Sequence, residues 1–297
     1  MLAYRHAFHA GNHADVLKHV VLVAALRHLN QKDKPYWVID THAGAGGYAL
    51  DSKYATQHDE FQDGIGKLWS VERKLPPLVD DYLGVVRAFN ADDGRLRRYP
   101  GSPEIVRALI RADDRQRLFE LHPTDFEILL ANFSADRRAK VENVDGFATI
   151  KALLPPPPRR ALVFIDPSYE IKTDYAKVHA AVQDGLKRFA QGMFMVWIPM
   201  LTRSEPAQLI DRLKRLPADD WLHVKLQVAE PADGGFGMLG TSMFVINPPW
   251  TLREQLAATM PFLVETLGQV SGAGYLIEHP GQARPATPRP RHTAPRR

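Results

Sequence analysis

The stretch that decides the fold is Ala161-Leu162-Val163-Phe164-Ile165-Asp166-Pro167-Ser168-Tyr169. Its first five residues are apolar and lack the alternation of a half-exposed strand, which predicts a strand buried on both faces of a parallel sheet. Ligands bind at the carboxyl ends of such strands, and Asp166 stands at that position. The sequence therefore predicts that Asp166 lies in a functional site.

The residues after this strand suit a flat base that carries an amino group. The Asp166 carboxylate can accept a hydrogen bond from the amine, and Pro167 fixes the backbone so that its own carbonyl can point the same way. Tyr169 offers a ring for stacking. The pattern is close to Asp-Pro-Pro-Tyr, a signature of amino-group methyltransferases, and an ordinary structural proline turn is the alternative.

Another buried strand, at residues 36–40, leads into a glycine loop that matches Gly-x-Gly-x-x-Ala at Gly44, Gly46 and Ala49. The pattern fits both dinucleotide and S-adenosylmethionine sites. A nicotinamide site expects an acid at the end of the next strand, roughly twenty residues further on. Residues 51–99 show helical spacing instead of a strand, so no strand ends in an acid at the expected distance.

Acids at the ends of later strands favour S-adenosylmethionine. Glu120 is placed to hold ribose hydroxyls, and Asp145 suits the adenine edge of the cofactor. Gly146 lets the backbone approach closely. With the turn at Asp166, four successive strand ends favour a methyltransferase over a dehydrogenase.

The alternation of strands and helices predicts an α/β fold with a doubly wound parallel sheet of the Rossmann-like class I methyltransferase type. Residues 1–50 and 100–280 form the methyltransferase domain in this prediction, and residues 51–99 form an inserted small helical subdomain. Residues 281–297, rich in proline and arginine, are expected to be a disordered basic tail.

Composition limits the setting of the protein. The chain has 297 residues and no cysteine, which excludes disulfides and thiolate metal sites, and it shows no leader or long apolar span, so we expect it in the cytoplasm. Five of its 38 basic residues are arginines after Glu278, where no acid occurs, and the remaining 33 face 34 acidic residues. Binding of nucleic acid must therefore depend on a local patch of basic residues.

The N-terminal region combines histidines with aromatic and basic residues. His9 and His13 are four residues apart, but a stable metal site needs a third converging ligand, so we predict no metal. Tyr4, Arg5 and His6 have the composition that stacks on and clamps single-stranded nucleic acid, although an ordinary packed terminus explains it equally well.

A second candidate for the acceptor site is Asn247-Pro248-Pro249-Trp250, which also matches the Asn/Asp-Pro-Pro-aromatic pattern. It follows a late strand, whereas the acceptor turn of an unpermuted sheet ends the fourth strand counted from the glycine loop. We therefore interpret it as a structural turn.

The N-terminal sequence Met1 to Lys18, together with Asp-Thr-His-Ala-Gly-Ala-Gly at residues 40–46, resembles the bacterial 23S ribosomal RNA adenine-N6 methyltransferases. The resemblance continues through Tyr99-Pro100-Gly101-Ser102-Pro103, Glu120-Leu121-His122-Pro123, Asp145-Gly146-Phe147, Lys172-Thr173-Asp174-Tyr175 and Ile246-Asn247-Pro248-Pro249-Trp250. It implies a monomeric, metal-free enzyme that uses S-adenosylmethionine on 23S ribosomal RNA, either naked or in an early assembly particle.

The resemblance also implies roles for individual residues. Asp166 would be the catalytic acceptor, and the RNA would be placed by Tyr4, His6 and Lys18. The cofactor would be contacted by His19, His42, Ser102, Glu120, Asp145 and Gly146.

One position departs from the family pattern, since Ser168 stands where the family usually carries a second proline. The carboxylate, the first carbonyl and the ring are kept, so we expect activity to survive. A nicotinamide-dependent oxidoreductase, a non-catalytic RNA-binding relative and a DNA methyltransferase remain the alternatives.

Overall fold

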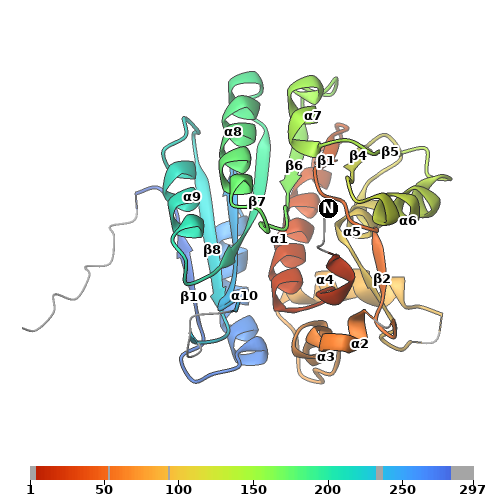
Figure 1. The fold of residues 1–297 in the computed structure, drawn as a ribbon, viewed down its shortest axis with the longest axis vertical. Helices are drawn as coiled ribbons and strands as arrows, with labels where there is room; N and C mark the ends of the chain where they lie inside the picture. The colour runs from red at the N-terminus through yellow and green to blue at the C-terminus, as the bar shows by residue number, and fades with distance from the viewer. Residues whose placement is uncertain (1–4, 53, 93, 232–236, 282–297) are drawn as a thin grey trace, which may run out of the picture.

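The computed structural model describes residues 5–52, 54–92, 94–231 and 237–281. A sheet of eight strands runs through it in the order β10-β8-β9-β7-β6-β1-β4-β5 (Figure 1). These strands are β1 (Trp37–Asp40), β4 (Arg115–Phe119), β5 (Ala139–Glu142), β6 (Ala161–Ile165), β7 (Met193–Met200), β8 (Trp221–Gln227), β9 (Gly240–Ile246) and β10 (Gly274–Glu278). Strands β2 (Gly47–Ala49) and β3 (Arg98–Pro100) form a separate small sheet.

The five neighbours β5, β4, β1, β6 and β7 are parallel, which confirms the Rossmann-like α/β fold. Strand β9 is antiparallel to both β7 and β8, and β10 is antiparallel to β8. The sheet is therefore largely parallel, as predicted, with an antiparallel edge that the sequence did not predict. Antiparallel neighbours need no helical crossover, and none occurs between β8 and β9 in the described part of the chain.

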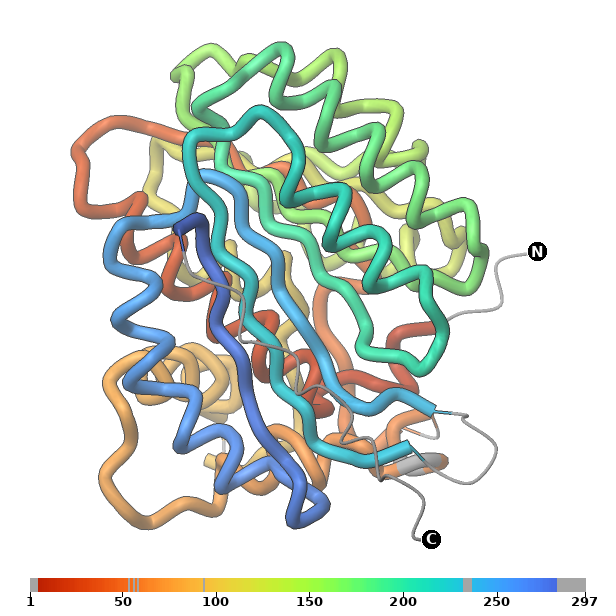
Figure 2. The backbone as a smooth tube through the Cα atoms, turned by 90° about the vertical axis from the view of Figure 1, so that its left-hand side faces the viewer, coloured from red at the N-terminus to blue at the C-terminus, as the bar shows by residue number. Residues whose placement is uncertain are grey.

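Helices cover both faces of the sheet. Helices α1 (His13–Asn30), α5 (Ser102–Leu109) and α10 (Leu252–Leu267) lie on one face. Helices α7 (Gly146–Leu153), α8 (Thr173–Arg188) and α9 (Glu205–Leu213) lie on the other, and Figure 2 shows the strands between these layers. Helix α6 (Pro123–Phe133) packs beside β5.

Strand β6 is buried along its whole length, as its sequence predicts. Leu162 and Phe164 point into the core shared with α1 and α10, and Val163 and Ile165 point into the core shared with α8 and α9. Because successive side chains point to opposite faces, an unbroken apolar run fills both cores.

Helix α1 is buried from its first turn. The Asn12 side chain caps it by accepting hydrogen bonds from the backbone N–H groups of Ala14 and Asp15, which confirms the predicted start. Nearly all its residues are buried, because α4, α5 and α10 and strand β9 surround it. The polar side chains of its first turns are consequently held inside the protein.

The segment between β2 and β3 is helical. It contains α2 (Ala55–His58), the 3₁₀ helix η2 (Glu60–Asp63), α3 (Ile65–Trp69) and α4 (Pro77–Phe89). Helix α4 packs against α1 and α10 and shares their apolar core. The division of the chain into a methyltransferase domain and an inserted subdomain stays a prediction.

Two sequence predictions fall outside the described residues: the contact of Tyr4 with RNA and the disordered tail, of which only Gly281 is described. Within the described residues, no helix is both long and apolar enough to cross a membrane.

Candidate active site

A cavity of about 480 Å³ opens at the carboxyl ends of β1, β4, β5 and β6. It brings together all the predicted cofactor and acceptor residues, and His6 and Lys18 line it as well. The predicted residues in its wall are His19, His42, Gly44, Ser102, Glu120, Asp145, Gly146, Asp166, Pro167 and Tyr169. Their individual roles stay predictions.

The glycine loop and Glu120 form one side of the cavity. The Gly44 N–H donates to Glu120 Oε2 at 2.8 Å, and the His122 N–H donates to Oε1 at 2.7 Å. Burial raises the pKa of Glu120, and these two backbone donors oppose the rise. Gly44 has a φ of +60°, and an added Cβ there would lie 2.2 Å from the Tyr48 hydroxyl. Only glycine fits this turn without strain.

Asp145 and Gly146 lie at the start of α7. The Asp145 side chain caps the helix by accepting from the Phe147 N–H at 2.9 Å. A Cβ on Gly146 would lie 2.1 Å from the Thr41 carbonyl oxygen, so glycine lets α7 meet the loop after β1. The His42 ring contacts Phe147 edge-on at 4.7 Å between centroids. The carboxylates of Glu120 and Asp145 accept hydrogen bonds, and together with the Phe147 ring they form a site that fits the hydroxyls and amine of an adenosine group.

His19 and Ser102 lie deeper, beside buried partners. His19 Nδ1 is 2.7 Å from the Tyr99 hydroxyl, and burial lowers the pKa of His19 to about 3, so its ring is neutral at pH 7. The Ser102 hydroxyl donates to Asp40 Oδ2 at 2.6 Å. Burial raises the pKa of Asp40 to about 7. Our sequence reasoning missed Asp40, although an acid that ends a buried strand is a readable signal.

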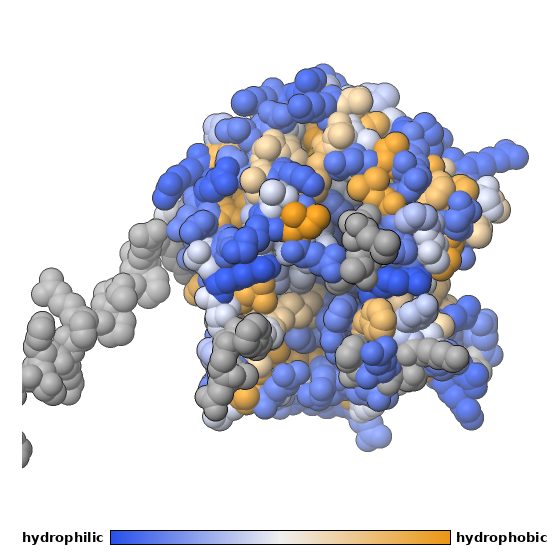
Figure 3. Space-filling model, in the orientation of Figure 1, coloured by the Kyte–Doolittle hydropathy of each residue, from blue (hydrophilic) through white to orange (hydrophobic). Residues whose placement is uncertain are grey.

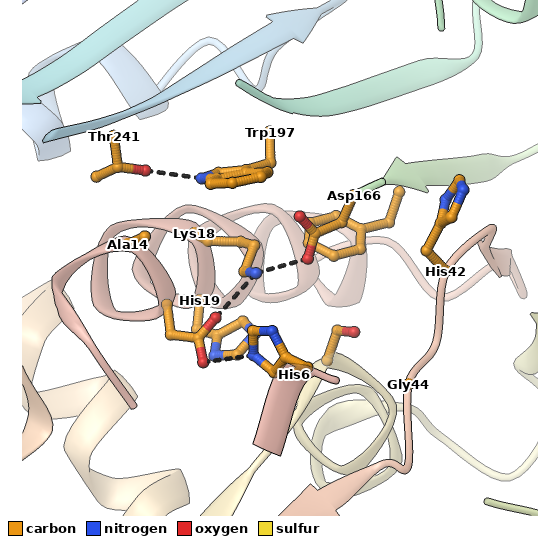
Figure 4. A network of polar contacts seen from close by, with 12 residues as sticks. His6, Ala14, Lys18, His19, His42, Gly44, Asp166, Trp197 and Thr241 are labelled. Atoms are coloured by element: carbon orange, nitrogen blue, oxygen red, sulfur yellow. Dashed lines mark hydrogen bonds and ion pairs between the residues drawn. The ribbon is translucent and has the colours of Figure 1, made fainter. Parts of the chain in front are cut away.

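Asp166 follows β6 directly and belongs to a chain of polar contacts (Figure 4). Its Oδ2 lies 2.5 Å from Lys18 Nζ, and the same ammonium lies 2.8 Å from Asp15 Oδ1. Asp15 Oδ2 lies 2.8 Å from His6 Nε2. Burial alone would lower the pKa of Lys18, but the two carboxylates raise it above its ordinary value. Lys18 is therefore a permanent cation against the predicted acceptor.

Tyr169 lies in the cavity wall, held by its neighbours. Its side chain is only 1% exposed, and its ring packs against Tyr175 and Trp197 at centroid distances of 4.5 and 5.8 Å. Its hydroxyl donates to the Trp197 carbonyl oxygen at 2.7 Å, and its φ is +55°. Stacking of a base on this ring stays a prediction.

The segment before α1 lies across the cavity and is fastened at both sides. Arg5 pairs with Asp125 at 2.9 Å, and His9 Nδ1 lies 2.9 Å from Glu60 Oε1.

Leu121 and Ile171, which also line the cavity, are 45% and 50% exposed. The face drawn in Figure 3 likewise carries hydrophobic residues scattered among hydrophilic ones.

The second acceptor candidate lies at the amino end of β7, opposite the carboxyl ends that surround the cavity. Asn247 follows β9, whose last residue Ile246 pairs with Phe194 near the beginning of β7. The Asn247 amide donates to the carbonyl oxygens of Ala190 and Gly192, so it serves as a structural turn. Among the described residues, no group of three or more His, Asp or Glu side chains could hold a metal ion.

A largely parallel sheet with a glycine loop and an acid-proline turn at neighbouring strand ends defines the class I S-adenosylmethionine-dependent methyltransferases. The family model described as "Ribosomal RNA large subunit methyltransferase D, RlmJ" matches residues 33–277. The chain therefore belongs to the RlmJ family.

Two relatives and one solved structure give the extent of the similarity. "Ribosomal RNA large subunit methyltransferase J" of Escherichia coli is 46% identical over 89% of this chain and 93% of its own length. The protein of the same name from Haemophilus influenzae is 42% identical over 94% of this chain and 98% of its own. A crystal structure of a Legionella pneumophila protein has a TM-score of 0.84 at 33% identity, covering 91% of this chain and 98% of its own. Family membership decides against the oxidoreductase and non-catalytic alternatives.

Proposed function

We propose that the protein methylates the N6 amine of an adenine in 23S ribosomal RNA, and that Asp166 binds this amine. As a member of the RlmJ family it is a ribosomal RNA methyltransferase with S-adenosylmethionine as cofactor. The observation that carries the proposal is the position of Asp166, which shares one cavity with the glycine loop, Glu120 and Asp145.

The amine of adenine is a weak nucleophile, because its lone pair is delocalised into the ring. S-adenosylmethionine would supply the methyl group and leave as S-adenosylhomocysteine, and N6 releases one proton to water for the methyl that it gains. Hydrogen bonds from the amine to the Asp166 carboxylate and the Pro167 carbonyl localise the lone pair and fix the angle of approach. Positioning by the protein is thus most of the catalysis.

The recess of Asp166 supports a flipped-out target. Its side chain is 14% exposed at the carboxyl end of β6, too deep to reach a base that remains stacked. We expect the adenine to enter the cavity as a single unstacked nucleotide, with His6 and Lys18 among the residues that place it.

The first prediction tests Asp166 itself. Asp166→Asn and Asp166→Ala should each reduce turnover by at least about 100-fold, because the amine loses its main acceptor. The affinity for S-adenosylmethionine should change less. The measurement uses radiolabelled S-adenosylmethionine and unmodified bacterial 23S RNA, digestion to nucleosides, and quantification of N6-methyladenosine.

Asp136→Asn is the matched control, since Asp136 is similarly buried, with 13% of its side chain exposed, and pairs with Arg138 outside the cavity. It should keep wild-type turnover. Wild-type rates in either Asp166 variant, or label in a different nucleoside, would reject the proposal.

We further propose that the protein acts in the cytoplasm as a monomer, on 23S RNA that is naked or in an early assembly particle. The recessed acceptor supports this choice of substrate, because a base packed inside a finished subunit could not enter the cavity. Comparing protein-free RNA with complete large subunits as substrates tests the point, and equal rates would contradict it.

A further inference from the structure

Asp15 is a fully buried acid that the proposed chemistry does not use. It lies in the first turn of α1 and has 0% of its surface exposed. Its Oδ2 accepts a hydrogen bond from the Gly11 N–H at 2.9 Å and contacts His6 Nε2, while Oδ1 pairs with Lys18 Nζ. Burial would raise the pKa of Asp15, but His6 and Lys18 hold it well below its usual range. Asp15 is therefore an anion that joins two residues of the cavity wall.

Lys18 depends on Asp15 for its position. A lysine side chain has a long flexible stem, and a buried ammonium must be paired. Two carboxylates hold this ammonium: Asp166 from the end of β6 and Asp15 from its own helix. The Trp197 ring lies 5.3 Å from Nζ, and its Nε1 donates to Thr241 at 2.8 Å (Figure 4). Asp15 is the only one of the two anions that is anchored within a helix.

The ammonium in turn orients Asp166. Lys18 occupies Oδ2, and no hydrogen bond or ion pair reaches Oδ1 from the described residues. A carboxylate fixed through one oxygen presents the other in a defined direction. Under the proposed function, Oδ1 is the oxygen that faces the amine.

We propose that Asp15 is a positioning residue for methyl transfer: it fixes Lys18, and Lys18 fixes the acceptor carboxylate of Asp166. This inference rests on the proposed function. Asp15 also lines the cavity, but it is 0% exposed and both its oxygens are engaged, so in this role it acts through Lys18. A purely structural role, as an acid near the start of α1, is the alternative to be tested.

The experiment is a double-mutant cycle of Asp15→Asn and Lys18→Met. An asparagine at position 15 has one accepting oxygen in place of two, so it cannot hold Gly11, His6 and Lys18 together. We expect kcat to fall about 100-fold in Asp15→Asn, the effect of misplacing a reacting group by about 1 Å. The affinity for S-adenosylmethionine should stay within about threefold of the wild type, by calorimetry.

The kcat of the double variant discriminates between the two roles. If Asp15 acts through Lys18, the double variant is no slower than Lys18→Met alone, within about threefold. Multiplied losses would overturn the inference, as would wild-type kcat in Asp15→Asn. Failure of the wild type to methylate N6 would instead reject the proposed function.

Asp114→Asn is the matched control for lost stability. Asp114 is also 0% exposed and is held by Arg111 and the Tyr36 N–H outside the cavity. It should lower the melting temperature without lowering kcat at 25 °C, and an equal kcat loss in this control would overturn the inference. If Asp15→Asn fails to fold, Asp15→Glu replaces it, with an expected kcat loss of about 10-fold and unchanged cofactor affinity.

Discussion

Glu120 illustrates how one side chain organises two loops. Its two carboxylate oxygens accept from the N–H groups of Gly44 and His122, which fixes the glycine loop against the end of β4. Each oxygen keeps a further lone pair, and a carboxylate with this geometry suits the two hydroxyls of a ribose. The residue is thus both a loop clamp and a proposed cofactor ligand.

Glu120→Gln should therefore weaken S-adenosylmethionine binding. An amide accepts through one oxygen only, and a hydrogen bond to a charged group contributes about 1.5–3 kcal/mol, so we expect the Kd to rise about 10- to 100-fold. Calorimetric titration measures this. Glu142→Gln is the matched control, because Glu142 ends the neighbouring β5 and pairs with Arg117 outside the cavity. An unchanged Kd in Glu120→Gln would contradict the assignment.

At the residue scale, the sequence indicates the positions of several polar residues that follow buried strands. Asp166, Glu120 and the glycine loop are readable because an apolar run stops and a polar residue follows. Asp15 and Trp197 are not readable in this way, since Asp15 looks like a helix-start residue and Trp197 lies inside an apolar strand. The orientation of Tyr169 depends on contacts with Trp197 and a left-handed backbone, which only the tertiary structure sets.

Helix α4 reaches the cavity through a short relay of hydroxyl groups. The Tyr82 hydroxyl lies 2.9 Å from that of Tyr99, and the latter lies 2.7 Å from His19 Nδ1. Tyr82 comes from the helical segment between β2 and β3, so this segment bears on the ring that is expected to touch the cofactor. The relay fixes which nitrogen of His19 faces Tyr99.

Tyr82→Phe should consequently loosen the His19 ring. The expected result is a loss of about 1 kcal/mol in stability and a several-fold weaker binding of S-adenosylmethionine. Tyr36→Phe is the matched control, because Tyr36 is equally buried and loses a hydrogen bond of 2.9 Å to Asn30 away from the cavity. Equal effects of the two variants on cofactor binding would count against the relay.

Strand direction is the element-scale property that the sequence does not disclose. The helix α1 and the buried strands β1 and β6 follow from apolar periodicity and the cap at Asn12. Strand β8 alternates Leu222, Val224 and Leu226 with polar residues, which is the pattern of a half-buried strand but carries no information on its direction. The reversal of β9 is not readable from the sequence, because pairing between distant segments determines it.

At the scale of the whole molecule, burial shifts the pKa values of histidines and of carboxyl groups in opposite directions. Burial lowers the pKa of His13 and His223 to about 4 and that of His19 and His42 to about 3. It raises the pKa of Asp40 and Glu104 to about 7. The folded protein therefore excludes four histidine protons and retains two carboxyl protons in mildly acidic solution.

Stability should fall on acidification between pH 6.5 and 4.5. In this window the unfolded chain binds the four histidine protons, while the folded chain binds the two carboxyl protons, which leaves about two net protons taken up on unfolding. The free energy of unfolding should decrease by about 2.7 kcal/mol per pH unit as pH falls. Urea unfolding at pH 6.5, 5.5 and 4.5 measures this.

Glu104→Gln provides the internal check, because it removes one opposing carboxyl group at a buried site. The dependence should steepen to about 4.1 kcal/mol per pH unit. A flat profile in the wild type, or an unchanged slope in the variant, would contradict this account.

The burial of α1 also has a consequence for biosynthesis. This helix is among the first parts of the chain to be made, yet β9, which packs on it, is completed about 210 residues later. At 5–20 residues per second the interval is roughly 10–40 s. Throughout that time the helix, which is apolar without interruption from Val20 to Leu26, lacks the strand that completes its burial. We therefore expect the nascent chain to bind chaperones at the ribosome.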